Sequence, residues 1–245
     1  MKYNVKSGQV SYGEAIGILL IQNYVPFVPG DVANATTYDY PVRFQRVPGL
    51  SVERIFNHDM TLYDDILEAA QSLVKEGVRA ITGDCGFLAL FQERLAEDLG
   101  IPVFLSSLLQ IPFIQRIISR RSKLGIVTAN KKVLDMEVFH ALGIKDKQMD
   151  RIVIGGLEKS RHFDSAVIRE DGVLDTKLME KEVLDASLLL HKENPELGAI
   201  LLECSLLPPY GKAVQEATGL PVFDFITMID YVFSAVVKKQ YYGFM

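Results

Sequence analysis

The sequence contains only two cysteines, Cys85 and Cys204, and they do not form a Cys-x-x-Cys pair. A secreted disulfide scaffold carries more cysteine in a shorter chain, so we expect two free thiols and a cytoplasmic protein. Histidine is also scarce: the chain has four, and none stands at ligand spacing from a cysteine. The sequence therefore predicts neither a metal site nor another cofactor.

Excess positive charge and long uninterrupted apolar runs are lacking too. The formal net charge is −5, and an acidic surface repels a phosphate backbone, so nucleic acid is not an expected partner. The longest apolar stretch, residues 220–237, contains Asp224 and Asp230, and the first residues do not resemble a signal peptide. We therefore expect no membrane association. The 49% of hydrophobic residues is instead typical of a globular protein with a large core.

Short apolar runs alternate with helical patterns along the chain. This alternation predicts βαβ units and a parallel sheet. Between the first strand and the first helix, residues 25–42 are rich in turn-forming residues and form a long loop, in which Asp31 and Asn34 either cover a cleft or form turns. We predict strands at 15–22, 78–85, 101–105, 123–130 and 151–156, and helices at 61–76, 88–99, 131–142 and 177–191.

Two segments of the chain match each other without a gap. Residues 78–104 align with residues 197–223, and the alignment places Cys85 on Cys204. Each cysteine follows an acidic residue and precedes a glycine by 15 positions, and each glycine is followed by the same Pro-Val-Phe sequence. Any two strand–helix–strand units share some features, but the common register and the equivalent cysteines favour a true repeat.

The repeat predicts an α/β fold with two similar lobes, each a parallel sheet flanked by helices and related by pseudo-twofold symmetry. We place the first lobe at residues 1–115 plus 221–245 and the second at residues 116–220. The active site is expected in the cleft between the lobes, because ligands of open α/β sheets bind beyond the carboxyl ends of the strands.

Both cysteines are predicted to end a strand and precede a helix. Unpaired amides at a helix start can hold an anionic group and lower the pKa of a thiol. Two tuned thiols on opposite sides of a cleft suit racemisation, in which one removes a proton and the other returns one. Free cysteines are also common core residues, but two at equivalent repeat positions favour a catalytic pair. The preceding Asp84 and Glu203 are expected to point away from the thiols and to have structural roles.

These residues resemble the aspartate/glutamate racemase superfamily, which works without pyridoxal phosphate and includes hydantoin racemases, maleate isomerases and arylmalonate decarboxylases. The resemblance covers residues 15–237 and rests on AITGDCGF, LLECSLLPP and the first strand of each half. It implies that Cys85 and Cys204 are the acid/base pair. It also implies that Asn23, Thr128 and Asn130 hold a substrate carboxylate, although either asparagine could simply cap a helix or turn.

The residues after each cysteine depart from the amino-acid racemase pattern. Gly86 and Phe87 replace the usual Asn-Thr, and Ser205 and Leu206 replace Thr followed by His or Glu. Gly86, Phe87 and Ser205 remain candidate substrate contacts, with Ser205 as a hydrogen-bond donor. The apolar replacements disfavour aspartate or glutamate and favour a bulkier or cyclic substrate such as a hydantoin.

We therefore predict a cofactor-independent racemase or epimerase that acts next to a carboxylate or carbonyl carbon of a small molecule. A cis-trans isomerase or decarboxylase of the same superfamily is an alternative, as is a two-lobed binding protein without catalysis. A Cys/His hydrolase lacks a histidine near either cysteine in the sequence. The resemblance also implies a homodimer.

Overall fold

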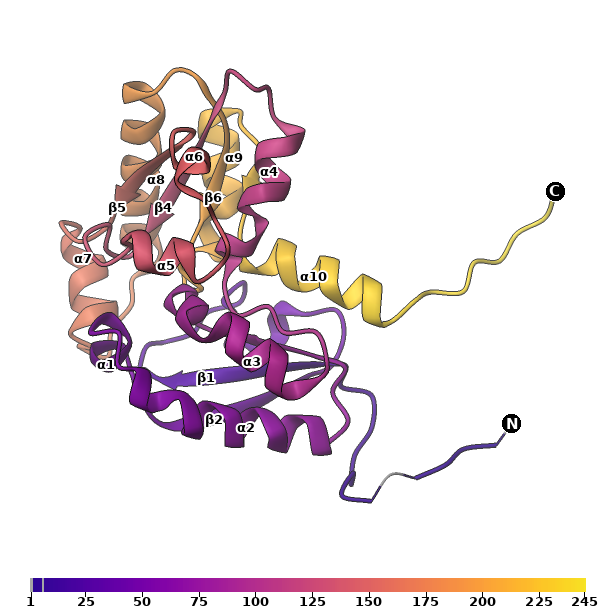
Figure 1. The fold of residues 1–245 in the computed structure, drawn as a ribbon. Helices are drawn as coiled ribbons and strands as arrows, with labels where there is room; N and C mark the ends of the chain where they lie inside the picture. Colours follow the sequence, from indigo (N-terminus) through magenta and orange to yellow (C-terminus); the bar gives the residue numbers. More distant parts are fainter. Residues whose placement is uncertain (1, 6) are drawn as a thin grey trace.

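Two parallel β-sheets flanked by helices form the framework of the computed structural model, which describes residues 2–5 and 7–245 (Figure 1). The first sheet has the order β2-β1-β3, and its strands are β1 (Ile16–Gln22), β2 (Val42–Ser51) and β3 (Ala80–Gly83). The second has the order β5-β4-β6-β7, and its strands are β4 (Lys123–Thr128), β5 (Ile152–Gly156), β6 (Leu197–Leu202) and β7 (Val222–Phe223).

Helices connect the strands and cover the sheets. The α-helices are α1 (Val52–Phe56), α2 (Tyr63–Lys75), α3 (Gln92–Leu99), α4 (Ile111–Ile117), α5 (Met136–His140), α6 (Asp146–Met149), α7 (Arg161–Phe163), α8 (Thr176–Glu193), α9 (Gly211–Thr218) and α10 (Phe225–Val236). Short 3₁₀ segments are η1 (Ala35–Thr37), η2 (Met60–Leu62), η3 (Gly86–Phe91), η4 (Ser107–Gln110) and η6 (Pro208–Tyr210), and η5 (Asp164–Ile168) is a π-helical turn.

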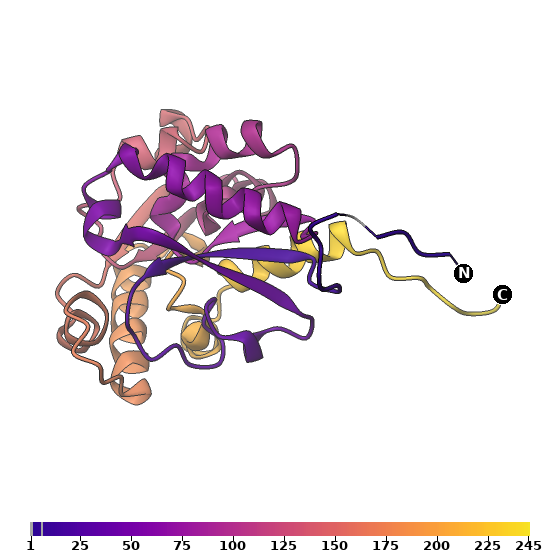
Figure 2. The same cartoon turned by 90° about the horizontal axis from the view of Figure 1, so that it is seen from below.

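Strand β1 is covered on both faces, which explains its continuous apolar sequence. Ile16 and Ile18 pack with α10, whereas a Cβ atom at Gly17, on the other face, would meet Leu73 of α2 at 2.9 Å (Figure 2). Gly125 of β4 occupies the equivalent place in the second sheet, against Leu190 of α8. Glycine at these two positions lets a helix lie close to its sheet.

One hydrophobic core extends across both sheets. It contains Leu19 of β1, Ile126 of β4, Phe87 of η3 and Ile114 of α4, all buried. Because these residues come from both halves of the chain, shared apolar packing holds the two sheets together. A second cluster lies between the second sheet and helices α8 and α9.

The repeat seen in the sequence occupies equivalent places in the two sheets. Ile81 N–H donates to Pro102 O at 3.0 Å, and Ile200 N–H donates to Pro221 O at 2.9 Å. Helices α3 and α9 end at Gly100 and Gly219, whose φ angles of 66° and 68° are left-handed. Glycine is the residue that most easily adopts this conformation, so both helices end for the same reason.

Most of the predicted elements are confirmed, and three details are corrected. The predicted strand 101–105 forms only a single bridge, from Val103 to Ile81. The predicted helix 131–142 contains only α5, because the Asp135 side chain caps a helix that begins at Met136. Strand β2 was not predicted, since Pro48 and the two arginines Arg43 and Arg46 obscure its apolar pattern.

The predicted boundaries of the two lobes stay a prediction. Strand β7, near the start of segment 221–245, pairs with β6 of the second sheet, whereas the following α10 packs against the first. Both ends of the chain extend from the same side of the molecule (Figures 1 and 2). Among the described residues, no helix has both the length and the apolar composition that crossing a bilayer requires.

Candidate active site

The two cysteines lie just beyond the carboxyl ends of two parallel strands. Cys85 follows β3 and is the N-cap of η3, with an extended backbone at φ −149° and ψ 128°. Cys204 follows β6 and precedes a turn, in which Leu207 N–H donates to Cys204 O at 3.1 Å. Equivalent strand ends of the two sheets therefore present both thiols, as the repeat predicts.

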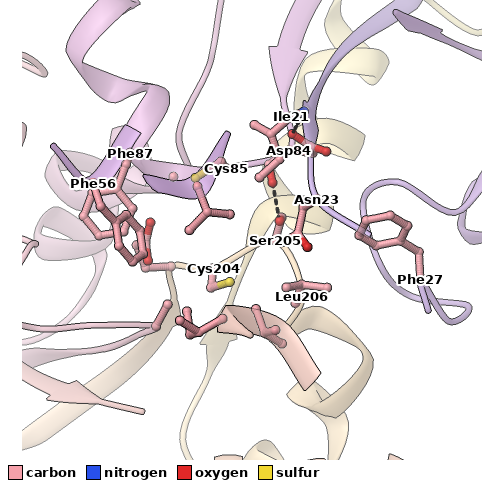
Figure 3. Close-up of a pocket in the computed structure, with 16 residues that line it drawn as sticks. Ile21, Asn23, Phe27, Phe56, Asp84, Cys85, Phe87, Cys204, Ser205 and Leu206 are labelled. Carbon is pink, nitrogen blue, oxygen red and sulfur yellow. Dashed lines mark hydrogen bonds between the residues drawn. The ribbon is translucent and has the colours of Figure 1, made fainter. Parts of the chain in front are cut away.

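Both thiols line one small pocket, whose internal volume is about 40 Å³ (Figure 3). Among the described residues that line it, none is Lys, Arg or His, and most are apolar. The lining residues are Ile21, Asn23, Phe27, Val52, Phe56, Asp84, Cys85, Gly86, Phe87, Ala129, Val167, Ile168, Glu203, Cys204, Ser205 and Leu206.

The structure brings together most of the site residues predicted from the sequence. Asn23, Gly86, Phe87 and Ser205 all line the pocket with the thiols. Ser205 Oγ donates to the backbone oxygen of Asp84, so this hydroxyl joins the two cysteine-bearing turns (Figure 3). The predicted donor is therefore already occupied by a contact within the protein.

Two predicted contacts lie outside the pocket lining. Thr128 is fully buried, and its hydroxyl donates to Glu203 Oε2 at 2.7 Å. The Asn130 side chain accepts a hydrogen bond from Lys132 N–H at 3.0 Å, which is the turn-capping alternative considered from the sequence. The neighbouring Ala129 lines the pocket instead.

Asp84 and Glu203, which were expected to point away from their own cysteines and to serve surface or interlobe structure, do not lie on the surface. Both are buried and line the pocket. Asp84 Oδ1 accepts from Ile21 N–H at 2.9 Å, and burial raises the pKa of this carboxyl well above its usual value. Burial also raises the pKa of Glu203 to about 7, and the hydrogen bond from Thr128 partly opposes this rise.

The expectation of acidic thiols is also wrong. Burial raises the pKa of Cys85 and of Cys204 far above their usual value, and the negative charge of Glu203 raises both further. Backbone amides act in the opposite direction: those of Phe87 and Leu88 lower the pKa of Cys85, and that of Leu206 lowers the pKa of Cys204. The helix-start effect is present, but burial outweighs it.

Two further segments line the pocket, namely η5, which the sequence did not assign to the site, and the long loop 25–42, for which covering a cleft was one expectation. Val167 and Ile168 come from η5, and Phe27 comes from the loop after β1. The two segments are joined, because Tyr24 N–H donates to Glu170 Oε2 at 3.1 Å. The loop itself is folded: Asp31 is buried, and its carboxylate accepts from Ala33 N–H at 2.7 Å. No periodic signal marks η5, so sequence reasoning had no means to find it.

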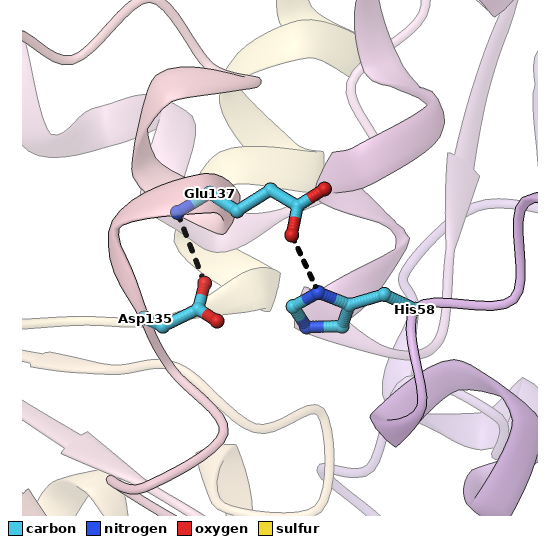
Figure 4. A group of neighbouring side chains, drawn as sticks. All are labelled: His58, Asp135 and Glu137. Carbon is cyan, nitrogen blue, oxygen red and sulfur yellow. Dashed lines mark hydrogen bonds and ion pairs between the residues drawn. The ribbon is translucent and has the colours of Figure 1, made fainter.

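A second polar cluster lies outside this pocket. His58 Nδ1 is 3.0 Å from Glu137 Oε2, and Asp135 Oδ1 accepts from Glu137 N–H at 3.0 Å (Figure 4). The three side chains offer ligand atoms within 4.8 Å of one another, but both acids are exposed. The hydrogen bond between His58 and Glu137 connects the segment after α1 with the start of α5, and it accounts for the geometry without a metal ion.

Solved structures with the same fold include several enzymes. The chain superimposes on an allantoin racemase from Klebsiella pneumoniae with a TM-score of 0.61 and 15% identity, covering 93% of this chain and 91% of that one. Unliganded arylmalonate decarboxylase gives a TM-score of 0.58 and 16% identity, covering 93% and 94%. Picrophilus torridus aspartate racemase gives 0.58 and 16%, covering 94% and 96%. The protein therefore shares the fold of these racemases and of this decarboxylase.

Curated sequences define a narrower relationship. A dimethylsulfoniopropionate lyase from Durusdinium sp. clade D is 30% identical over 236 residues, which are 94% of this chain and 77% of that protein. Dimethylsulfoniopropionate lyase 3 from Emiliania huxleyi (strain CCMP1516) is 30% identical over 237 residues, 94% of this chain and 61% of its own length. The chain therefore belongs to the dimethylsulfoniopropionate lyase family. A scan against protein-family models found no match.

Proposed function

We propose that this protein is a lyase that cleaves dimethylsulfoniopropionate, or a closely related sulfonium carboxylate, by removing a proton next to the carboxylate. The observation that carries the proposal is the pocket itself: two thiols and two buried acids face a small apolar space that has no basic lining residue. Such a space suits a small substrate with a positive charge better than a dicarboxylate. Family membership supports the same activity.

The reaction follows from the chemistry of this substrate. A thiolate takes the proton from the carbon next to the carboxylate and becomes a thiol. The electron pair left on that carbon forms a carbon–carbon double bond as the bond to sulfur breaks. Dimethyl sulfide leaves as a neutral molecule with the electron pair of the broken bond, and acrylate remains. The elimination needs one base, and either Cys85 or Cys204 could supply it.

Backbone amides provide donors where negative charge develops. The amides of Phe87, Leu88 and Leu206 already interact with the two thiols and would stabilise a thiolate. The pocket is apolar around them, which strengthens such interactions relative to water. We infer that these amides, rather than a basic side chain, favour the charged base.

Racemisation is the second candidate, and the presence of both thiols in one pocket favours it. A racemase needs a base on each face of the substrate, whereas an elimination needs only one. The two thiols come from different sheets and can meet this requirement. The predicted hydantoin-like or other carbonyl substrates belong to this candidate, and the predicted cytoplasmic location and homodimer stay predictions.

Product analysis tests the proposed lyase. The purified chain would be incubated with dimethylsulfoniopropionate, with dimethyl sulfide measured by gas chromatography and acrylate by NMR. Single enantiomers of amino acids, allantoin and substituted hydantoins would be followed in D₂O by NMR and circular dichroism. Equal yields of dimethyl sulfide and acrylate support the lyase. Inversion of an enantiomer without sulfide release supports the racemase instead.

A further inference from the structure

Glu203 has a buried carboxylate oxygen without a partner. Its Oε2 accepts a hydrogen bond from Thr128 Oγ1 at 2.7 Å, whereas no hydrogen-bond partner for Oε1 exists among the described residues. The residue is fully buried and lines the pocket with both cysteines. A buried carboxylate is costly unless it is paired, so an unpaired oxygen on a residue that lines a ligand site indicates what the ligand carries.

The surroundings of Glu203 offer acceptors and no positive charge. No Lys, Arg or His stands among the described residues that line the pocket. Asp84 lines it as a second buried acid, and Asn23 Oδ1 is a second buried oxygen without a partner. An uncharged hydrophobic ligand or an anionic group would leave these atoms unpaired, whereas a cationic group would pair with them.

The backbone near Cys85 leaves room for this carboxylate. A Cβ atom added at Gly86 would overlap Glu203 Oε1, and Glu203 atoms are the three nearest that it would meet. The φ angle of Gly86 is not positive, so its backbone conformation does not require glycine. Its small size instead lets Glu203, from the second cysteine-bearing turn, reach the first one.

We propose that Glu203 binds the positively charged end of a zwitterionic carboxylate substrate and thereby makes the activity of the thiols depend on that charge. This inference rests on the proposed lyase and adds the determinant of its substrate class. The negative charge of Glu203 raises the pKa of both thiols when it is unpaired. A bound sulfonium group offsets that charge, so it lowers the pKa of the base that will attack the same molecule.

A pair of ligands that differ only in charge tests the inference. Trimethylammoniopropanoate carries the cation and has a poor leaving group, and 4,4-dimethylpentanoate has the same shape and the same carboxylate without the positive charge. Titration calorimetry would measure both with the wild type, with Glu203→Gln and with Glu216→Gln, an exposed acid on α9. The wild type and Glu216→Gln should bind trimethylammoniopropanoate at least about tenfold more tightly than the ligand of the same shape that lacks the positive charge. In Glu203→Gln, the two affinities should become nearly equal.

The outcomes separate this inference from the proposed activity. A preference for the cation that survives in Glu203→Gln overturns the role of Glu203, even if dimethyl sulfide is released. Equal binding of both ligands by the wild type overturns it without any variant, so a failure of Glu203→Gln to fold does not protect it. Charge preference that depends on Glu203, combined with no sulfide release, supports the cation site and rejects the lyase.

Discussion

The two cysteine-bearing turns have the same backbone arrangement and different side chains. Asp84 N–H donates to Leu19 O of β1 at 3.1 Å, and Glu203 N–H donates to Val127 O of β4 at 2.8 Å. The backbone of each acid is therefore bonded to the equivalent strand of its own sheet. The side chains then diverge. Asp84 accepts a hydrogen bond from the backbone of Ile21 on β1, whereas the longer Glu203 accepts one from Thr128 and leaves its second carboxylate oxygen, beside Gly86, without a partner among the described residues.

The two halves thus share a backbone framework, whereas the side chains that differ between them shape the pocket for a specific substrate. Strand ends and helix-ending glycines coincide in the two halves because the fold requires them, and the two thiols occupy equivalent places on this framework. Gly86 and Ser205 do not coincide in character: one leaves space for Glu203, and the other donates across to Asp84 O. The pocket is thus asymmetric although the framework around it is repeated, and an asymmetric site suits an elimination with one base.

Replacing each thiol gives the largest expected effect. A racemase needs both thiols, so Cys85→Ser and Cys204→Ser should abolish inversion equally. For the lyase, we expect the substitution of the base to lower kcat about 10²–10⁴-fold and that of the other cysteine to lower it less. Initial rates of dimethyl sulfide release measure both. Full activity in both variants would remove the thiols from the mechanism.

The raised pKa of Glu203 should make the free energy of unfolding of the protein depend on pH. Burial raises the pKa of Glu203 from its usual 4.5 to about 7, so the folded state holds its proton more tightly than the unfolded state. The resulting stability is fully present below about pH 4.5 and is lost as the pH rises through about 7, a change of about 3 kcal/mol.

Glu203→Gln should remove this share of the pH dependence. Urea unfolding at about pH 5 and about pH 8 would measure it in the wild type and in the variant. Asp31, whose pKa burial also raises to about 7, should leave part of the slope in place. Identical slopes in the two proteins would show that the Glu203 carboxyl titrates normally.

Gly86→Ala should destabilise the protein by forcing a methyl group into the space that Glu203 occupies beside the Cys85 turn. The added methyl group would overlap Glu203 Oε1, so we expect a loss of about 1–3 kcal/mol in the free energy of unfolding. The same substitution in a Glu203→Ala background should cost much less, because the overlapping carboxylate is gone. Denaturant titration of the single and double variants measures the coupling. Additive costs would mean that Glu203 does not occupy the space beside Gly86.

The smallest losses of stability should come from replacing the glycine that ends a helix in each half, and the two losses should be equal. Gly100→Ala and Gly219→Ala each place a Cβ atom on a left-handed residue, and no atom lies within 4 Å of either position. The backbone penalty alone should then cost about 1–2 kcal/mol at each site. Thermal unfolding of the two variants would compare them. Clearly unequal costs would indicate that the two helix ends are not equivalent.

The sequence predicted the repeat, most strands and the meeting of the two cysteines, because these features depend on local apolar patterns and on strand order. It missed β2, whose charged residues and Pro48 hide the apolar positions. It also missed Val167 and Ile168, since η5 reaches the pocket by tertiary packing alone.

The electrostatic predictions failed for a related reason. Burial decides the pKa of Cys85, Cys204 and Glu203, and the depth of a strand end in a two-sheet structure cannot be read from the residues around it. The class of substrate could not be deduced from the sequence for the same reason. The apolar Phe87 indicated a site unlike that of amino-acid racemases, but the unpaired Glu203 oxygen became visible only in the fold.

Deuterium labelling at the carbon next to the carboxylate tests the central claim most directly. The rate of dimethyl sulfide release would be compared for unlabelled substrate and for substrate deuterated at that carbon, and unreacted substrate from a reaction in D₂O would be examined by NMR. The account predicts slower release from the labelled substrate or deuterium in the recovered substrate, and the loss of that signal when the base is replaced by serine. Unchanged rates together with no exchange would contradict proton removal by a thiol in this pocket.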